Sequence, residues 1–397
     1  MEWEKVKLSE VTEYITDGDH QPAPKSDSGV LFVKIKDIQD NRLTFDNALF
    51  VPQEYYNRLP KNRKAEYGDT LYTVVGSYGI PAFVNHNIPF CFERNIALLH
   101  PNNRVIPKYL YYAVNNPIFY GNANNIANGS AQKLIPLSKL AGMEISVPPI
   151  ERQETIVNIL SAYDDLIENN QKQIKLLEEA AQRLYKEWFI DLRFPGHENV
   201  KIVDGVPEGW ERMVLSEVTS ILKRGISPKY SDNGKYSVIN QKCIRSSIMD
   251  ISESRRQEKE YVPTLNLQDS DTVICSTGTG TLGRVGRVYG DYPNTTFDSH
   301  VTLVRAKENP NYIYHVVKSQ QEYLMGMGRG STNQQELYRD VIERLVVLCP
   351  SQDILLKAER VLNAIHCKIK AVYLQNNLLV ESRDRLLPKL MSGEIEV

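Results

Sequence analysis

The chain has 397 residues, of which 42% are hydrophobic and 24% charged, and its formal net charge is −2 at pH 7. This is the composition of a globular protein of two or three domains, and it excludes disordered and collagen-like chains. The net charge argues against a free-standing nucleic-acid binder, because neutralisation of phosphates by Lys and Arg dominates the affinity of such proteins. Any DNA role must use local patches or a basic partner.

The five cysteines are odd in number and form no Cys-x-x-Cys pair, and the seven histidines are scattered singly. We therefore expect no disulfide framework and assign no metal site. The sequence also has no run of 18 apolar residues and no apolar signal core at its start. These features predict a reduced, cytoplasmic protein that does not cross a membrane.

A long tandem repeat organises the chain. The opening Trp-Glu…Leu-Ser-Glu-Val-Thr pattern of residues 3–12 returns at 210–219, which is 207 residues later. Three further segments recur in the same order, 69–71 as 271–273, 107–111 as 310–314, and 129–130 as 330–331. A period this long is not that of a solenoid of short stacked units, so each half must carry its own core.

Each half begins with a segment that reads as mixed and strand-rich. Period-two alternation at 31–36 and 284–289 predicts strands, and turn clusters separate such runs. Short helices are predicted at 107–116 and 310–320. We therefore expect two mixed α/β modules, at residues 1–149 and 195–349.

A long heptad helix follows each module. Seam residues recur at alternating steps of four and three from Ile156 to Trp188 and from Ala358 to Leu390, and prolines precede both runs. One such run alone is equally consistent with a helix packed on its own domain. Two matched runs favour an antiparallel coiled coil formed by segments 150–194 and 350–397.

The register of this coiled coil follows from one asparagine in each seam. Placing Asn170 opposite Asn376 closes the register end to end, with Ile174 facing Val372. A lone Asn in a seam lowers stability but fixes the register. Charge agrees, because residues 151–190 carry 8 acidic and 5 basic side chains, whereas 352–392 carry 4 acidic and 7 basic.

The sequence carries no catalytic motif that we recognise. Residues 278–283 match the Gly-x-Gly-x-x-Gly dinucleotide fingerprint, but the residues that follow alternate like a strand and do not open a helix. A glycine-rich turn close to a ligand, or a plain structural turn, is the better interpretation. The Val-Pro-Pro-Ile run at 147–150 lacks the chemical groups of an amino-methyltransferase loop, and metal-nuclease and phosphate-loop motifs are absent.

Polar, glycine-flanked loops recur early and late in each half, at 16–21 and 223–227 and at 128–133 and 329–334. Gln, Asn, Arg and Lys read base edges, and Ser and Thr reach bases or phosphates. Any one of these residues could simply belong to a solvated loop, but their recurrence favours recognition. The candidate DNA-binding residues are Asp19, His20, Gln21, Lys34, Lys36, Ser77, Tyr78, Arg94, Ser130, Gln132 and Lys133 in the first half, and Lys223, Arg224, Ser227, Lys229, Gln241, Lys242, Thr277, Thr279, Arg329, Ser331, Asn333 and Gln334 in the second.

With these features the chain resembles the specificity subunit of type I restriction-modification enzymes. The resemblance spans the whole chain and rests on the opening of each half, the Gly-Ser-x-Gln loop at 129–132, the Val-Pro-Pro-Ile-x-x-Gln run at 147–153, the Trp-Phe…Phe-Pro-Gly-His exit at 188–197 and the Pro-Glu-Gly-Trp re-entry at 207–210. The second-half loop departs from the first, with Thr332-Asn333 where the first has Ala131-Gln132. Base contacts therefore cannot be copied between the halves.

The resemblance implies an α+β fold in which two pseudo-symmetric target-recognition domains are joined by two long antiparallel helices forming a coiled-coil spacer. Each domain would read one part of a bipartite, asymmetric site in double-stranded DNA. The spacer would dock two methyltransferase subunits, motor-nuclease subunits would join, and S-adenosylmethionine, ATP and Mg²⁺ would bind to those partners and not to this chain. This non-catalytic interpretation has two rivals, a self-contained DNA-modifying enzyme and a coiled-coil adapter that never touches DNA.

Overall fold

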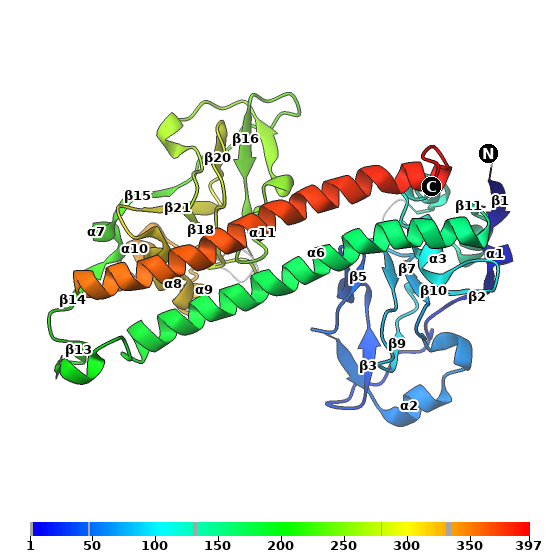
Figure 1. Ribbon diagram of the computed structural model, residues 1–397, viewed down its shortest axis with the longest axis horizontal. Helices are drawn as coiled ribbons and strands as arrows, with labels where there is room; N and C mark the ends of the chain where they lie inside the picture. Colours follow the sequence, from blue (N-terminus) through cyan, green and yellow to red (C-terminus); the bar gives the residue numbers. More distant parts are fainter. Residues whose placement is uncertain (1–2, 47, 130–132, 279, 331–334) are drawn as a thin grey trace. The chain divides into compact units, whose positions relative to one another are not determined.

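The computed structural model describes residues 3–46, 48–129, 133–278, 280–330 and 335–397. Its contacts divide the chain into unit 1, which comprises the residues up to Glu168 together with Asn377–Val397, and unit 2, Asn169–Asn376. Each unit holds one strand-rich module and part of both long helices, α6 (Ile150–Tyr185) and α11 (Gln352–Ser392) (Figure 1). We call residues 3–149 module 1 and residues 207–349 module 2.

The centre of module 1 is a four-stranded antiparallel sheet in the order β2-β10-β7-β8. Its strands are β2 (Thr12–Asp17), β10 (Ile96–Pro101), β7 (Thr70–Thr73) and β8 (Pro81–Phe83). Side chains alternate along β7 and β10, so that Leu71 and Leu98 enter one core while Tyr72 and Leu99 enter the other. The sheet is therefore covered on both faces.

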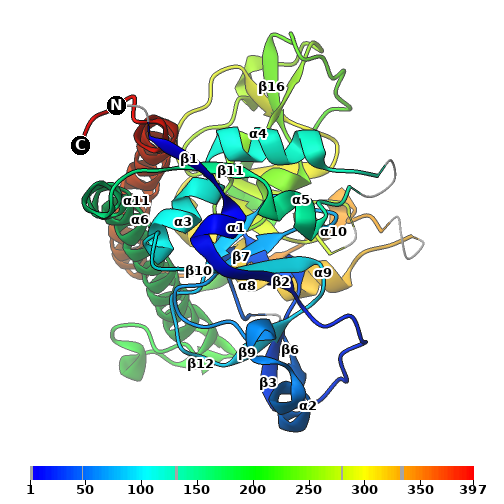
Figure 2. The ribbon, with the colours of Figure 1, turned by 90° about the vertical axis from the view of Figure 1, so that its right-hand side faces the viewer.

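One face of this sheet carries helices and the other a smaller sheet (Figure 2). The helices are α3 (Pro107–Val114) and α4 (Pro117–Ile126), and the smaller sheet has the order β6-β3-β9. The remaining elements are β1 (Glu4–Lys7), α1 (Leu8–Val11), β3 (Val30–Val33), η1 (Ile35–Asp37), β4 (Ile38–Gln39), β5 (Arg42–Leu43), β6 (Leu49–Val51), α2 (Gln53–Arg58), η2 (Lys61–Arg63), β9 (Phe90–Phe92), α5 (Leu137–Ala141) and β11 (Glu144–Val147).

Module 2 repeats the two main sheets of module 1 strand for strand, but the β4-β5 pair has no counterpart among its described strands. Its sheets have the orders β15-β21-β18-β19 and β17-β16-β20, and β14 pairs with β22 as β1 pairs with β11. Its elements are β14 (Glu211–Val214), α7 (Leu215–Val218), β15 (Thr219–Arg224), β16 (Tyr236–Ile239), η5 (Gln241–Cys243), η6 (Ile251–Glu253), β17 (Arg255–Gln257), η7 (Pro263–Leu265), β18 (Thr272–Cys275), β19 (Val285–Arg287), β20 (Thr295–Phe297), β21 (Val301–Ala306), α8 (Pro310–Ser319), α9 (Gln321–Gly326), α10 (Arg339–Glu343) and β22 (Val346–Cys349). The tandem repeat is thus a structural repeat, and positions can be compared between modules.

The repeated Leu-Ser-Glu-Val-Thr motif is a structural device. In module 1 the carboxylate of Glu10 accepts from the backbone N–H of Lys7 at 3.1 Å, and the hydroxyl of Thr12 donates to the carbonyl of Leu8 at 2.8 Å. Glu217 and Thr219 make the same two bonds in module 2. These bonds satisfy backbone groups at both ends of a one-turn helix, which explains why the motif recurs.

The repeated Asp-Thr-aliphatic motif is also structural. Asp69 is fully buried, accepts from the backbone N–H of Glu66 and lies 2.6 Å from His100 Nδ1. Its equivalent Asp271 accepts from Gln268 N and binds Arg305 through two bonds of 2.7 Å. Burial raises the pKa of both carboxyls, and the hydrogen bonds oppose that shift. Each aspartate therefore ties the start of the β7 or β18 strand to its neighbour in the sheet.

The two long helices pack antiparallel, and every predicted seam position among the described residues is buried or half-buried. In unit 1, Ile156 and Leu160 share a core with Leu390, and in unit 2, Ile174 packs with Val372. The buried Asn170 donates through Nδ2 to Gln375 Oε1 at 3.4 Å, one residue from the buried Asn376.

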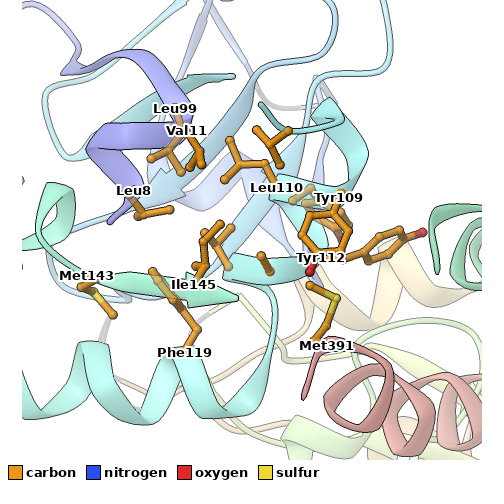
Figure 3. Packing of buried hydrophobic residues seen from close by; sticks show 14 of the residues in the cluster. Leu8, Val11, Leu99, Tyr109, Leu110, Tyr112, Phe119, Met143, Ile145 and Met391 are labelled. Carbon is orange, nitrogen blue, oxygen red and sulfur yellow. The ribbon is translucent and has the colours of Figure 1, made fainter. Parts of the chain in front are cut away.

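The C-terminal part of α11 enters the core of module 1. Figure 3 shows Met391 in the same core as Tyr112 of α3 and Phe119 of α4. The C-terminal end of α6 continues as the π-helix η3 (Lys186–Ile190). The segment that then leads into module 2 contains η4 (His197–Asn199), β12 (Ile202–Val203) and β13 (Val206–Pro207). Phe194 packs there on Trp210, with ring centroids 4.7 Å apart, which gives a packing role to the Phe of the Phe-Pro-Gly-His motif and the Trp of the Pro-Glu-Gly-Trp motif.

Several sequence predictions can be compared with these elements. The short helices at 107–116 and 310–320 are confirmed as α3 and α8. The strand predicted at 31–36 is too long, because β3 ends at Val33 and the Asp37 carboxylate accepts from Lys34 N at 2.8 Å to start η1. The strand predicted at 284–289 is likewise shorter, because β19 spans only Val285–Arg287, and it pairs antiparallel with β18. No helix among the described residues is both long and apolar enough to span a membrane.

Candidate nucleic-acid interface

Each module has a hollow at the same place in its fold, and polar side chains form part of its lining. Both hollows lie beside the end of the strand that pairs in parallel within the smaller sheet, β9 in module 1 and β20 in module 2. Hollow 1 has a volume of about 380 Å³, and hollow 2 about 390 Å³. Hollow 1 is lined by Asp19, His20, Gln21, Lys34, Glu93 and Arg94, among others. Hollow 2 is lined by Tyr230, Gln241, Lys242, Arg255, Asp298 and His300, among others.

A glycine brings the early loop close to this strand in both modules. A Cβ atom at Gly18 would overlap the carbonyl oxygen of Phe92, and one at Gly225 would overlap that of Phe297. A parallel bridge then joins Asp19 to Glu93, and its counterpart joins Ile226 to Asp298. The glycines flanking the early loops are therefore needed for a close approach of two backbones.

The carboxylates of the first early loop are used inside module 1. Asp19 accepts from Tyr55 Oη and from the Arg63 guanidinium, each at 3.1 Å, and Asp17 Oδ2 lies 2.9 Å from His20 Nε2. Burial, followed by the bond to Asp19, raises the pKa of Tyr55. Asp19 thus fixes the loop, while the exposed side chains of His20 and Gln21 face hollow 1.

Two of the three predicted cations around β9 line hollow 1. These are Lys34, which is half-buried, and Arg94, which is exposed. Lys36 is exposed on η1 and does not line this hollow. The carboxylate of Glu93 accepts from the backbone N–H of Ile35 at 2.7 Å, so this acidic group is partly committed to holding η1.

The late loop of module 1 meets the turn after β7. The backbone N–H of Gly76 donates to the Lys133 carbonyl at 3.1 Å, and Lys133 Nζ lies 3.3 Å from Tyr78 Oη. The same ammonium donates to Asn124 Oδ1 at 3.0 Å, and Tyr78 stacks on Tyr120 with ring centroids 6.1 Å apart. The structure therefore brings the predicted residues Tyr78 and Lys133 together, while Ser77 is exposed beside them.

Sequence reasoning missed Asn124 and Tyr120 of α4. Their spacing of four residues places both on one side of a helix, and Tyr120 is 46% exposed. The sequence feature that could have indicated a site here is an aromatic residue, Tyr120, one helical turn from the polar residue Asn124. This feature does not reveal that Tyr78 and Lys133 lie beside these residues, because the turn after β7 and the late loop are distant from each other in sequence.

The corresponding place in module 2 is built differently. Arg224 forms an ion pair with Glu336 and donates through Nε to the Ser299 carbonyl at 2.5 Å. Burial lowers the pKa of Arg224, and the charge of Asp298 opposes this. Thr277 Oγ1 lies 2.5 Å from His300 Nδ1, and the Arg329 guanidinium lies 5.6 Å from the centre of the Tyr338 ring. Sequence reasoning found the basic residues and Thr277 but missed their partners.

The other predicted residues of module 2 surround hollow 2 or lie near it. Gln241 and Lys242 line it, beside Tyr230, whose ring lies 3.6 Å from the Arg255 guanidinium. Lys229 is exposed and pairs with Glu258 at 2.9 Å. The carbonyl of Ser227 accepts from Lys259 Nζ, and Lys223 is exposed on β15. The predicted residues Ser130, Gln132, Thr279, Ser331, Asn333 and Gln334 lie outside the described residues.

Comparisons with known proteins agree with this architecture. Residues 1–179 and 207–354 match the family model described as the type I restriction modification DNA specificity domain. The match covers most of the chain, and the chain belongs to this family. Among the described residues, no cluster of three or more His, Cys, Asp or Glu side chains could hold a metal ion.

Relatives and solved structures carry the same description. The chain is 28% identical over 324 residues to the type I restriction enzyme MjaIX specificity subunit of Methanocaldococcus jannaschii, with 78% of this chain and 74% of the relative covered. It is 22% identical over 477 residues to the HindI specificity subunit of Haemophilus influenzae, with 99% and 100% covered. The crystal structure of a type I restriction-modification S subunit from M. genitalium is similar in fold, with a TM-score of 0.58, 17% identity, and 98% and 96% of the two chains covered.

Proposed function

We propose that this chain is the DNA-recognition subunit of a type I restriction-modification complex, and that each module reads one part of a bipartite, asymmetric site in double-stranded DNA. The observation that carries the proposal is that both modules have, at equivalent places, a hollow with polar side chains in its lining and a polar cluster at the turn after β7 or β18. Membership of the specificity-domain family supports it. Base edges in the major groove are read by such hydrogen-bonding side chains held on a rigid framework.

Asymmetry of the site follows from side chains that differ at equivalent backbone positions. Strand pairing aligns Asp17 with Arg224, Lys34 with Asn240, Asn95 with His300, and Lys133 with Gln335. Where one module has an ammonium and the other has an amide at the equivalent position, as at Lys34 and Asn240, the two side chains do not select the same base. Two modules with one framework should therefore read two different sequences.

The long helices supply the surface that we assign to the protein partners. Large apolar side chains stay exposed on both helices outside the seam, namely Leu166 and Leu176 on α6 and Leu356, Val361, Leu374 and Leu378 on α11. A protein partner that covered these side chains would bury their apolar surface. We assign two methyltransferase subunits to this surface, with motor-nuclease subunits joining them. S-adenosylmethionine, ATP and Mg²⁺ would then bind to these partner subunits. This chain would recognise the DNA sequence without catalysing a reaction.

The experiment is to map modified bases across the genome of a host that expresses this chain with its methyltransferase subunits. The proposal predicts one asymmetric motif with two specified parts separated by an unspecified stretch. Modification by the purified chain alone would instead support a self-contained enzyme. Absence of any sequence-specific modification or DNA binding by the complex would support the adapter alternative.

A further inference from the structure

Four side chains of module 1, Tyr78, Tyr120, Asn124 and Lys133, form one connected group that we call the Tyr78 cluster. Lys133 Nζ lies 3.0 Å from Asn124 Oδ1 and 3.3 Å from Tyr78 Oη, and it sits 5.7 Å from the centre of the Tyr78 ring. Tyr78 Oη also donates to Asn124 Oδ1. Lys133 and Asn124 are both exposed, so the group faces solvent.

The charge of this cluster is not neutralised within the described residues. No acidic side chain there lies within ion-pair distance of Lys133. Two other cations of the interface do form ion pairs, Arg63 with Asp19 and Arg224 with Glu336. An ammonium held by two neutral oxygens keeps its attraction for an acceptor on a ligand.

The hydrogen bonds also fix which way the Asn124 amide points. An ammonium can only donate, so the amide atom 3.0 Å from Lys133 Nζ must be the oxygen. That oxygen also accepts from Tyr78, which engages both of its lone pairs. The amide nitrogen of Asn124 is then the group left for a ligand, and it offers only donors.

The cluster is also held in place. Tyr120 lies over Gly79, where an added Cβ would meet the tyrosine ring at 2.5 Å, and Tyr78 stacks on Tyr120 at an angle of 14°. In module 2 the equivalent of Lys133 is Gln335, and Met325 lies over Gly283 as Tyr120 lies over Gly79. The Tyr78 cluster therefore belongs to module 1 alone.

We propose that the Tyr78 cluster reads a guanine in the half-site recognised by module 1, through the N7 and O6 acceptors of that base in the major groove. Lys133 and Asn124 present adjacent donors, which match two adjacent acceptors. Adenine places an amino donor beside its N7, so one of the two protein donors would meet a donor. This inference rests on the proposed function and names the base at one position of the site.

The experiment uses the complex of this chain with its methyltransferase subunits and duplexes that carry its site. The half-site of module 1 is first identified by exchanging residues 1–149 for those of a relative. Each guanine of that half-site is then replaced, one at a time, by 7-deazaguanine, which lacks only the N7 acceptor. At one position we expect affinity to fall by roughly 5- to 100-fold, the range for losing part of a paired base contact.

A variant places this contact on Lys133. In Lys133→Met the sensitive position should tolerate 7-deazaguanine with no further loss, whereas Lys139→Met, an exposed lysine on α5, should keep the full sensitivity. If 7-deazaguanine is harmless at every guanine, or the half-site holds no guanine, the inference is wrong while the proposed function stands. If Lys133→Met only weakens all sequences equally and lowers the salt dependence, Lys133 contacts a phosphate and the inference is also wrong. Failure of the unmodified complex to prefer any sequence would overturn the proposed function itself.

Discussion

His315 and His366 face each other through their Nε2 atoms at 3.0 Å, where α8 of module 2 packs on α11. The equivalent pair in unit 1 is Tyr112 and Asp164, in which the tyrosine hydroxyl donates to the carboxylate at 2.6 Å. Tyr289 Oη lies 2.7 Å from His366 Nδ1, and with this hydroxyl as donor both imidazoles are neutral. The two modules are thus joined to the helices by contacts of different chemistry.

We expect low pH to weaken the contact between α8 and α11 in unit 2. Burial, then the charge of Arg287, lowers the pKa of His315 to about 3 and that of His366 to about 2. Lys318 adds to the positive charge, while Glu178, whose own pKa burial raises, lies nearby. In the folded protein the pKa values of both histidines lie below the ordinary histidine value of 6.5, so the unfolded chain binds more protons as the pH falls below 6.5. The stability that the neutral histidines allow is therefore present above pH 6.5 and is lost as the pH falls. The loss reaches about 1.4 kcal/mol per histidine at pH 5.5.

Thermal unfolding at pH 7.5 and 5.5 measures this loss, and His366→Gln should reduce the difference between the two pH values. Hydrogen exchange at the two pH values should show faster opening of α11 residues 358–370 in acid than of residues 380–390. Equal acid sensitivity of the two segments would contradict the prediction.

A second prediction concerns the ion pair between Arg383 and Asp164, whose atoms lie 2.9 Å apart with both side chains mostly buried. Arg383→Met leaves the Asp164 carboxylate without its charged partner, with only the hydrogen bond from Tyr112, and should cost about 2–4 kcal/mol of stability. The control is Arg385→Met on the same helix, because Arg385 pairs with Glu381 at an exposed surface and should contribute under about 1 kcal/mol. Chemical unfolding of the two variants checks the difference, and equal losses would argue against a structural role for Arg383.

The glycines of the early loops give a third prediction. Gly18→Ala and Gly225→Ala should destabilise their own modules or displace the loop, since the new Cβ would overlap a backbone carbonyl. Gly121→Ala in α4 meets nothing within 4 Å and should be neutral or stabilising by up to about 1 kcal/mol. Thermal unfolding and DNA binding are the measurements. A Gly18→Ala protein with unchanged stability and binding would show that the close approach is not required.

A fourth prediction tests whether the ion pair with Glu336 keeps Arg224 from contacting DNA. Glu336→Gln should release the guanidinium, raise DNA affinity at low salt and increase the salt dependence by about one phosphate contact. Glu343→Gln changes the net charge equally but frees Arg339, which lies on α10 and is not one of the candidate DNA-binding residues. Binding titrations over a salt series compare the two. The same response from both variants would indicate a general charge effect.

Periodicity made the repeat, the two long helices and the helical seam predictable, because these depend on spacing along the chain. The site was less predictable because its pairings are long-range. Asp19 looks like a base reader in sequence, yet Tyr55 and Arg63, 36 and 44 residues away, take up its carboxylate. The contacts of Lys133 with Tyr78 and Asn124 form only because the fold brings the late loop next to α4 and to the turn after β7. Sequence alone could locate the loops but not which side chains stay available.

The central claim is that the two modules read DNA independently, and module exchange tests it most directly. Residues 1–149 are replaced by the corresponding segment of a relative with a different module, and the modified sequences are mapped in a host that expresses the hybrid with its methyltransferase subunits. We predict that one part of the bipartite motif changes while the other part and the asymmetry remain. A change in both parts, or a motif that proves to be one continuous palindrome, would contradict the account.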